Sequence, residues 1–178
     1  MLEAVLDRPE AMTRALQGDA DSFSRLIQPL LDPAYRLAAV MLNDRTAAED
    51  AVQEAAIKAW RKLRQLRGDM QSLRPWFMSI VANECRMTRR RRWFSVVKMP
   101  DVEPDRAEER SPEAIADLQV AVARLKPDER LPLVLYFYLD MPLDEVAGAL
   151  HVSPAAAKAR IYRAAHKLRA DLTLEEVT

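Results

Sequence analysis

The stretch SLRPWFMSIVANECRMTRRRRW, residues 72–93, shows most clearly how this chain folds. It predicts a helix that begins at Ser72, with Pro75 in the first turn, where proline is tolerated. Helical spacing places an apolar set on one arc: Trp76, Phe77, Ile80, Val81 and Met87. A polar set falls on the opposite arc: Ser79, Asn83, Arg86 and Arg90. One face is therefore expected to enter a core, and the other is available to a partner.

The end of this predicted helix is strongly basic. Arg86 is followed, without any intervening acid, by Arg89, Arg90, Arg91 and Arg92. An unbalanced cluster of this size beside amide and hydroxyl side chains indicates a surface for phosphates and bases. The alternative is a basic helix end that only complements the helix dipole, for which one or two arginines would suffice.

The composition indicates an all-α protein. Gly is scarce, with 3 residues among 178, whereas Ala, Leu, Arg and Glu are abundant. A hydrophobic fraction of 49% allows a real core, in one larger domain or two small ones. The single cysteine, Cys85, excludes an internal disulfide and a cysteine-based zinc site, and it fits a reducing cytoplasm. No apolar run approaches the roughly 18 residues of a membrane span, so no membrane insertion is expected.

The charges balance overall but are unevenly distributed. The chain has 27 basic and 27 acidic residues, which argues against a simple nucleic-acid coat protein. Residues 1–94 hold 16 basic and 12 acidic residues, whereas 113–178 hold 8 and 10. Within the latter part, residues 151–170 hold five basic residues and no acid. Two basic helices in a neutral chain suit local nucleic-acid contacts beside separate protein-facing surfaces.

Helical periodicity divides the chain into two small helical domains. Before residue 72 we expect helices at 10–17, 23–42 and 47–66. Asp21 and Ser22 are expected to cap the second of these, and Pro29 and Pro33 to kink or break it. Thr46 or Asp44 is expected to cap the third. Residues 95–112 are acidic and rich in proline, without apolar periodicity after Val97, and predict an extended linker. The predicted domains are therefore 1–94 and 113–178.

The second domain contains a predicted helix-turn-helix. A helix at 113–125 and a largely apolar stretch at 129–139, with Pro132 in its first turn, precede it. A short helix at 143–150, a tight turn and a helix from Ser153-Pro154 to about Leu172 then form the motif. The inward set of the last helix is Ala157, Ile161, Ala164 and Leu168. The outward set is Lys158, Arg160, Tyr162, Arg163 and Lys167. This arrangement favours DNA binding over an ordinary helical hairpin.

Three segments together resemble a bacterial sigma factor of the extracytoplasmic function (ECF) subfamily. The polymerase-binding helix of sigma region two is similar to AEDAVQEAAIKAWRKLRQLRGD, residues 48–69. Its promoter-melting and −10-reading helix is similar to RPWFMSIVANECRMTRRRR, residues 74–92. Region four is similar to LKPDERLPLVLYFYLDMPLDEVAGALHVSPAAAKARIYRAAHKLR, residues 125–169. The resemblance implies a transcription initiation factor that binds core RNA polymerase and promoter DNA, and that is not an enzyme.

The resemblance assigns the polymerase and −10 contacts. The β′ clamp contacts are Asp50, Gln53 and Glu54, a carboxylate-amide cluster that suits an arginine-rich partner unless it is only a solvated acidic face. A pocket for an unstacked base is implied at Leu66 to Arg74, because only single-stranded DNA can fill it. Asn83 and Arg86 are expected to face the −10 strand, and Arg89 to Arg92 its phosphates. Trp76 lies on the apolar arc and is expected in the core rather than as a stacking platform.

The resemblance likewise assigns the −35 contacts and further partners. Lys158, Arg160, Tyr162 and Arg163 are expected in the major groove, and Lys167 on phosphates. The apolar 131–138 stretch is expected to be mostly core, with a part for the β flap or an anti-sigma factor. The acidic linker is expected either to thread the polymerase channel or to act as a spacer.

The sequence departs from the family pattern in the turn of the helix-turn-helix. His151 stands where the family usually has Gly, and the position is expected to need a positive φ, which His tolerates better than most residues. Ala156-Ala157 stand where Thr-Val is usual, so a hydroxyl for phosphate or base is missing.

Other classes of function fit less well. His151 and His166 have no evident acid or cysteine partner, so neither an enzymatic site, a metal site nor a cofactor is expected. A helix-turn-helix regulator that acts without core polymerase remains an alternative, but it leaves residues 48–92 unexplained. A purely protein-binding adaptor is disfavoured by the two basic helices.

Overall fold

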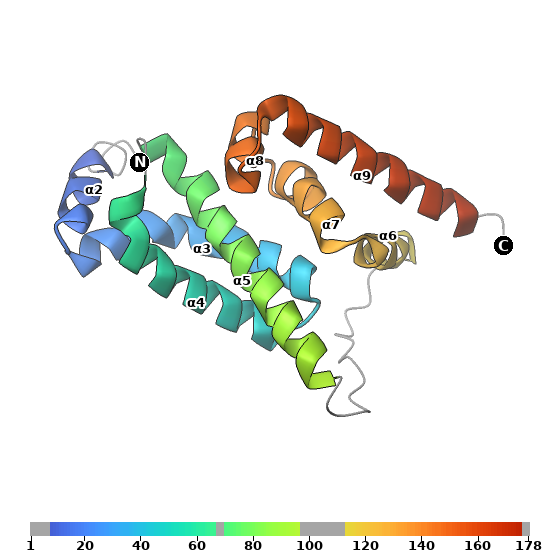
Figure 1. Cartoon of the computed structure of the whole chain (residues 1–178), viewed down its shortest axis with the longest axis horizontal. Helices are drawn as coiled ribbons and strands as arrows, with labels where there is room; N and C mark the ends of the chain where they lie inside the picture. The colour runs from blue at the N-terminus through green and yellow to red at the C-terminus, as the bar shows by residue number, and fades with distance from the viewer. Residues whose placement is uncertain (1–7, 67–69, 97–112, 176–178) are drawn as a thin grey trace.

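A computed structural model of the chain describes residues 8–66, 70–96 and 113–175. Most of these residues are helical and none of them is in a strand, and the helices form two groups along the chain (Figure 1). The N-terminal bundle consists of α2 (Arg8–Leu16), α3 (Ala20–Leu42), α4 (Arg45–Lys62), the short turns η1 (Leu63–Gln65) and η2 (Met70–Ser72), and α5 (Leu73–Val96). The C-terminal bundle consists of α6 (Glu113–Arg124), α7 (Pro127–Leu133), the π-helical turn η3 (Val134–Tyr138), α8 (Leu143–Leu150) and α9 (Pro154–Glu175). The all-α prediction with two helical groups is confirmed.

The predicted linker lies almost entirely outside the described residues. The structure describes nothing between 97 and 112, so neither an extended path nor a role in the polymerase channel is tested. α5 continues to Val96, two residues past the predicted domain boundary.

The expected cap of α3 and the expected break at its prolines were wrong. Its N-cap is Asp19, whose carboxylate accepts a hydrogen bond from the Ser22 N–H at 3.2 Å, so the helix begins three residues before the predicted start. Pro29 and Pro33 lie inside one continuous helix. Each proline removes one backbone hydrogen bond, but packing of the apolar face of the helix outweighs that loss. The cap of α4 is Asp44, one of the two residues considered for it.

Small side chains let α4 pack closely between its neighbours. Its buried face consists largely of alanines: Ala47, Ala48, Ala51, Ala55 and Ala59. α3 and α5 pack against this helix and against each other. Buried residues of α5 include Leu73, Phe77, Met78, Val81, Ala82, Glu84 and Cys85. Met87 was predicted in the core but is 40% exposed, because the buried stripe continues along the 77, 81, 85 line and leaves it at the edge.

The central helix of the C-terminal bundle starts earlier than predicted, whereas its apolar 131–138 stretch is mostly buried, as expected. α7 begins at Pro127, so Pro132 lies in its last turn rather than its first. Leu131 to Leu135 are buried, but Tyr136, Phe137 and Tyr138 are exposed by 38%, 65% and 52%. The wider π-helical turn carries these three aromatic rings to the surface.

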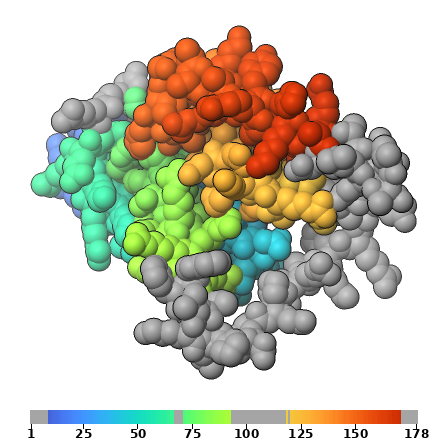
Figure 2. Space-filling view, turned by 45° about the vertical axis from the view of Figure 1, so that its right-hand side comes forward, coloured from blue at the N-terminus to red at the C-terminus, as the bar shows by residue number. Residues whose placement is uncertain are grey.

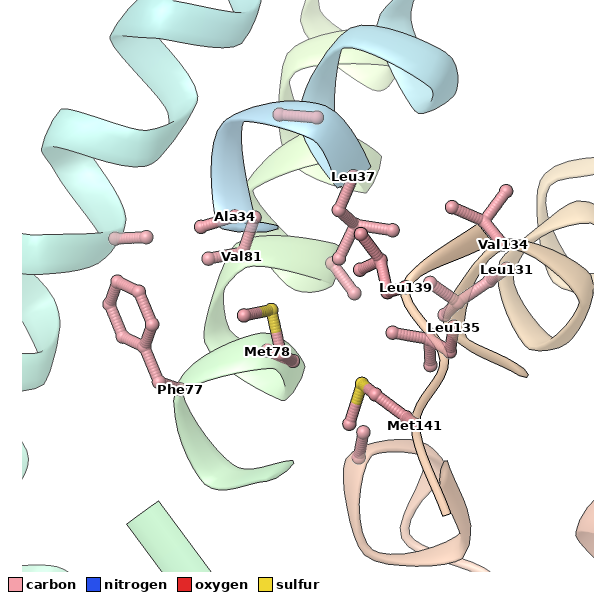
Figure 3. Packing of buried hydrophobic residues seen from close by; sticks show 14 of the residues in the cluster. Ala34, Leu37, Phe77, Met78, Val81, Leu131, Val134, Leu135, Leu139 and Met141 are labelled. Carbon is pink, nitrogen blue, oxygen red and sulfur yellow. The ribbon is translucent and has the colours of Figure 1, made fainter. Parts of the chain in front are cut away.

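The two bundles pack against each other. α5 contacts α8, and α3 contacts α7 and η3. Figure 2 shows α8 and α9 lying directly over α5 and α7. Buried residues of both bundles belong to one apolar cluster, part of which is drawn in Figure 3. Each fully buried Leu or Met side chain in such a cluster contributes roughly 1.5–3 kcal/mol to stability.

Candidate nucleic-acid interface

The α8–α9 pair has the geometry of a helix-turn-helix. α8 ends at His151, which has φ 53° and ψ 46° and donates its backbone N–H to the carbonyl oxygen of Gly148 at 3.2 Å. The positive φ expected at this position is therefore confirmed. The Ser153 Oγ accepts a hydrogen bond from the Ala156 N–H at 3.3 Å and caps α9.

The sequence correctly predicted which side of α9 faces out. Ala157, Ile161 and Ala164 are buried and Leu168 is half-buried. The exposed residues include all five predicted −35 contacts: Lys158, Arg160, Tyr162, Arg163 and Lys167. Tyr162 is 65% exposed, and the Lys158 Nζ lies 5.8 Å from its ring centroid. Exposure makes these side chains available to DNA.

Lys167 differs from the other members of this face because it is paired within the bundle. Its Nζ lies 2.9 Å from the Oε2 of Glu129, at the start of α7. The hydrogen bond from Lys167, together with one from the Lys126 backbone N–H, lowers the pKa of Glu129. A phosphate would have to compete with this carboxylate for Lys167.

The basic half of α5 is more heavily engaged. Asn83, Arg86, Arg90, Arg91 and Arg92 are exposed, and Arg89 is half-buried. Arg92 Nη2 lies 2.6 Å from the Oδ2 of Asp44, and Arg86 Nε lies 3.5 Å from the Oδ1 of Asp128 in the other bundle. The hydrogen bond from the Ala47 N–H, followed by that from Arg92, lowers the pKa of Asp44. Arg86 and Arg92, both predicted −10 residues, thus lie against carboxylates of this chain.

The predicted polymerase-binding residues lie on one face of α4. Asp50 and Gln53 are exposed, whereas Glu54 is half-buried beside Lys58, with Oε1 and Nζ 3.3 Å apart. Lys58 also donates to the buried Glu84 of α5 at 2.6 Å, and this hydrogen bond is the main cause that raises the pKa of Lys58. Lys58 therefore joins Glu54 to α5, an arrangement that the sequence did not predict because the partners lie 26 residues apart.

The loop before α5 borders an open groove of about 770 Å³ between the bundles. The N-terminal bundle contributes Gln65, Leu66, Gln71, Ser72, Pro75 and Trp76. The C-terminal bundle contributes Pro142, Asp144, Glu145, Gly148 and His151. Trp76 packs against the core and also reaches this groove, so its predicted core position is only partly realised. Residues 67–69 of the predicted base pocket lie outside the described residues.

The sequence predicted that a part of the 131–138 stretch is available to a partner but did not assign its residues, and the exposed part is the aromatic cluster of η3. Tyr136 and Phe137 meet edge to face, with ring centroids 5.0 Å apart, and the Arg36 guanidinium lies 5.8 Å from the Tyr138 centroid. Three consecutive aromatic residues point in different directions on a regular helix, so they cannot all face the core. This run of three was the sequence signal for exposed aromatic rings.

Other kinds of site find no support among the described residues. In this part of the chain no group of three His, Cys, Asp or Glu side chains could hold a metal ion. Cys85 is buried, and burial raises the pKa of its thiol to about 12, which makes it a core residue rather than a nucleophile. Among the described helices none combines the length and apolar character needed to cross a bilayer.

Comparison with known families matches both bundles. Residues 26–95 match the Sigma-70 region 2 family and residues 115–168 match the Sigma-70, region 4 family. The RNA polymerase sigma factor NccH of Alcaligenes xylosoxydans xylosoxydans is 32% identical over 179 residues, covering 92% of this chain and 94% of NccH. The ECF RNA polymerase sigma factor SigE of Mycolicibacterium smegmatis is 29% identical, covering 86% of this chain and 62% of SigE.

Some relatives are longer than this chain. The match spans 43% of a probable RNA polymerase sigma factor, RfaY, of Xanthomonas campestris pv. campestris, which is 29% identical. Among solved structures, CnrH in complex with the cytosolic domain of CnrY has a TM-score of 0.70 at 24% identity, covering 94% of this chain and 97% of CnrH. The sigma factor RpoE of Bartonella quintana, in complex with the anti-sigma factor NepR, has a TM-score of 0.68 at 21% identity, covering 86% and 98%. At this level of identity the two structures support the fold.

Proposed function

The chain belongs to the sigma-70 family of RNA polymerase sigma factors, in its ECF subfamily, and on this premise we propose that it is an alternative transcription initiation factor. In this role it binds core RNA polymerase in the cytoplasm and directs it to specific promoters. The N-terminal bundle serves as region two and the C-terminal bundle as region four. Sigma factors recruit and position a polymerase and have no enzymatic activity of their own.

The observation that carries this proposal is the presence of two cationic helix faces on separate bundles. The outer face of α9 presents Lys158, Arg160 and Arg163, and the end of α5 presents Arg90 and Arg91. Each face can contact phosphates, and each includes neutral polar groups, Tyr162 and Asn83, that can contact bases. We assign the α9 face to the −35 element and the α5 face to the −10 element.

Promoter opening without ATP requires binding energy that is available only in the melted state. A base that has left the stack can enter a pocket, whereas a paired base cannot. The turn η2 and the start of α5 border such a space, with Gln71, Ser72 and Trp76 on its wall. We assign capture of the unstacked −10 base to this wall, with Asn83 and Arg86 beside the strand.

Polymerase contacts belong to other surfaces. Asp50 and Gln53 are exposed on α4 and, with Glu54, offer carboxylate and amide oxygens to a basic surface of the β′ clamp. The exposed rings of Tyr136, Phe137 and Tyr138 suit an apolar protein partner. The β flap or an anti-sigma factor is the proposed partner there, since RpoE of Bartonella quintana has been solved with an anti-sigma factor.

Run-off transcription tests the proposal directly. Core polymerase with this protein, on DNA from upstream of its own gene, should give a specific transcript that core polymerase alone does not give. A second measurement distinguishes this proposal from the alternative, a regulator that acts without polymerase. The free protein should bind promoter duplex weakly and core polymerase tightly, and strong sequence-specific binding of duplex by the free protein would favour the alternative.

A further inference from the structure

A row of three charged side chains leads from the surface of α4 into the core beside α5. Glu84 of α5 is 4% exposed and is the only buried acid among the described residues. Its Oε2 accepts a hydrogen bond from the Lys58 Nζ at 2.6 Å. The same Nζ lies 3.3 Å from the Oε1 of Glu54, one helical turn earlier on α4. Lys58 is therefore shared between a carboxylate in the core and a carboxylate at the surface.

Lys58 lies closer to the buried carboxylate for a physical reason. A carboxylate that has lost its water needs a cation or strong hydrogen-bond donors, whereas an exposed carboxylate is stabilised by solvent. The side chain of Glu84 is 5% exposed and that of Glu54 is 46% exposed. The pKa of Lys58 is raised mainly by its hydrogen bond to Glu84 and less by its hydrogen bond to Glu54. Glu84 is thus the stronger partner of the ammonium group.

The three side chains together keep a negative charge at the surface. They are two carboxylates and one ammonium group, so one negative charge remains uncompensated. Because Glu84 holds the ammonium group toward the core, that charge lies on the side of Glu54. If Glu84 were neutral, Lys58 would be left with Glu54 alone, and the two would form an ordinary neutral pair along the helix. The buried acid of α5 therefore maintains the charge of a surface acid of α4.

We propose that Glu84 is a positioning residue for polymerase binding, which holds Lys58 so that Glu54 keeps its negative charge toward a basic partner. Glu84 acts through Lys58 and does not contact the polymerase itself, because it lies in the core. The inference rests on the proposed function, since it takes Glu54 as a contact of the β′ clamp. It adds that the helix assigned to −10 DNA also sets the charge of the surface assigned to the polymerase.

The variant Glu84→Gln tests the inference, because it removes the buried charge and keeps the size of the side chain. Lys58 should then turn to Glu54 and neutralise it. The affinity for core polymerase, measured without DNA, should fall about tenfold, as expected when one charge-assisted hydrogen bond is weakened. An unchanged affinity would overturn the proposal.

A second change distinguishes positioning from a general loss of structure. Lys58→Met/Glu84→Gln removes the ammonium group as well, so Glu54 is negative again and the affinity for core polymerase should return to the wild-type level or above. A merely structural role of the Lys58–Glu84 pair predicts the opposite, because the double variant has lost both members of the pair. An affinity as low as that of Glu84→Gln alone would therefore overturn the proposal.

A double-mutant cycle gives a test that leaves Lys58 in place. Glu54→Gln in the wild-type background should weaken polymerase binding about tenfold. In the Glu84→Gln background the same change should cost much less, because Lys58 has already compensated the charge of Glu54. Equal losses in the two backgrounds would mean that Glu84 does not act through Glu54.

Asp44→Asn is the matched control. It removes one carboxylate from another ion pair between α4 and α5, the pair of Asp44 with Arg92, and this pair does not include Glu54. The affinity for core polymerase should therefore stay at the wild-type level. An equal loss in Asp44→Asn and Glu84→Gln would mean that the affinity depends on how the two helices are joined, and it would overturn the role of the Glu54 charge.

A crystal structure of the free Glu84→Gln protein tests the geometry without polymerase. The Lys58 Nζ should lie within hydrogen-bond distance of the Glu54 carboxylate and should have left position 84. An ammonium group that stays beside position 84 would overturn the proposal. If the wild type does not bind core polymerase, the proposed function is wrong, whereas this structure still decides whether Glu84 directs Lys58.

Discussion

The cationic faces of α5 and α9 are similar in composition and differ in what surrounds them. On α9, Lys158, Arg160 and Arg163 point outward, and within the described part of the chain no ion pair joins them to a carboxylate. On α5, Arg92 lies on Asp44 and Arg86 on Asp128. The α9 face is therefore ready for a ligand as it stands, whereas the α5 face has to exchange partners first.

This difference suits the two tasks proposed for the helices. A duplex element can be read by a rigid, preformed surface. A melted element exists only after the promoter has opened, so a surface whose arginines are occupied until then binds little DNA prematurely.

The largest effect is expected from replacing Arg89, Arg90, Arg91 and Arg92 together by Ala. The polymerase complex should then release up to four promoter phosphates, and the salt slope of promoter binding should fall by about 0.7 to 0.9 for each phosphate released. A fall corresponding to three phosphates would mean that Arg92 stays on Asp44 in the complex. The neutral control is Asn83→Ala, which should change sequence preference and leave the slope alone. An unchanged slope in the quadruple variant would mean that the cluster does not bind DNA.

The next effect concerns base reading by α9. Arg160→Ala or Arg163→Ala should cost on the order of 1–3 kcal/mol of promoter binding if the side chain contacts a base with two hydrogen bonds. Binding to a panel of −35 variants measures this, and discrimination at one position should disappear. Lys167→Ala is the matched control, because Lys167 is held by Glu129 and should give a smaller loss that is uniform across the panel. If both arginine variants instead lose affinity equally for all −35 variants, the two side chains contact the phosphate backbone of the DNA.

A smaller effect is expected from Asp44→Asn, which keeps a good helix cap but removes the charge beside Arg92. The free energy of unfolding should fall by about 0.2–1 kcal/mol, and the salt slope of promoter binding should rise if Arg92 then reaches a phosphate. Asp44→Ala, as a control, should lose the cap as well, at about 1 kcal/mol. A slope that is the same in the wild type and the Asn variant would mean that Asp44 does not restrain Arg92 in the complex.

The ion pair between Asp44 and Arg92 also predicts that the stability of the fold falls at low pH. The pKa of Asp44 is lowered in the folded protein, so its contribution to stability is fully present above its unfolded pKa of about 4 and is lost as the pH falls through the lower folded pKa. Denaturant unfolding of the wild type should therefore show a steeper loss of stability below about pH 4 than the Asn variant shows. If the wild type and the Asn variant lose stability equally as the pH falls, Asp44 does not contribute to the pH dependence.

The smallest effect is expected at the turn before α9. His151→Gly should relieve a left-handed backbone that costs a non-glycine residue about 1–2 kcal/mol, while the freer unfolded chain takes back about 0.4–1 kcal/mol. The free energy of unfolding should rise by roughly 0.5 kcal/mol in thermal or denaturant unfolding. If the α9 face is preformed by packing, −35 preference should not change. A change in preference would mean that His151 itself contacts DNA.

Local sequence determined the helices and their faces. Caps such as Asp44 and Ser153, and the spacing of Ala157, Ile161 and Ala164, depend on neighbours within four residues, so the sequence alone predicted them. The all-α class and the outward face of α9 followed from the same local rules. The positive φ of His151 also follows, because the chain has to turn within a few residues between two helices.

Where local rules compete with packing, the sequence was a poorer guide. Pro29 and Pro33 favour a break, but the long apolar face of α3 packs on α4 and α5 and keeps one helix. Met87 and the three rings of η3 are apolar and yet exposed, because the position of the core, not hydrophobicity alone, decides what is buried.

Only the tertiary structure decided how the two bundles meet and which arginines are occupied. Arg130 and Val40 are 90 residues apart in sequence, Arg74 and Glu145 are 71 apart, and Arg92 and Asp44 are 48 apart. No local pattern encodes such pairs, since each depends on where whole helices come to rest. The sequence by itself therefore determined two helical bundles with two basic faces, and the tertiary packing that brings Asp44 to Arg92 and Asp128 to Arg86 decided that these faces are not equally free.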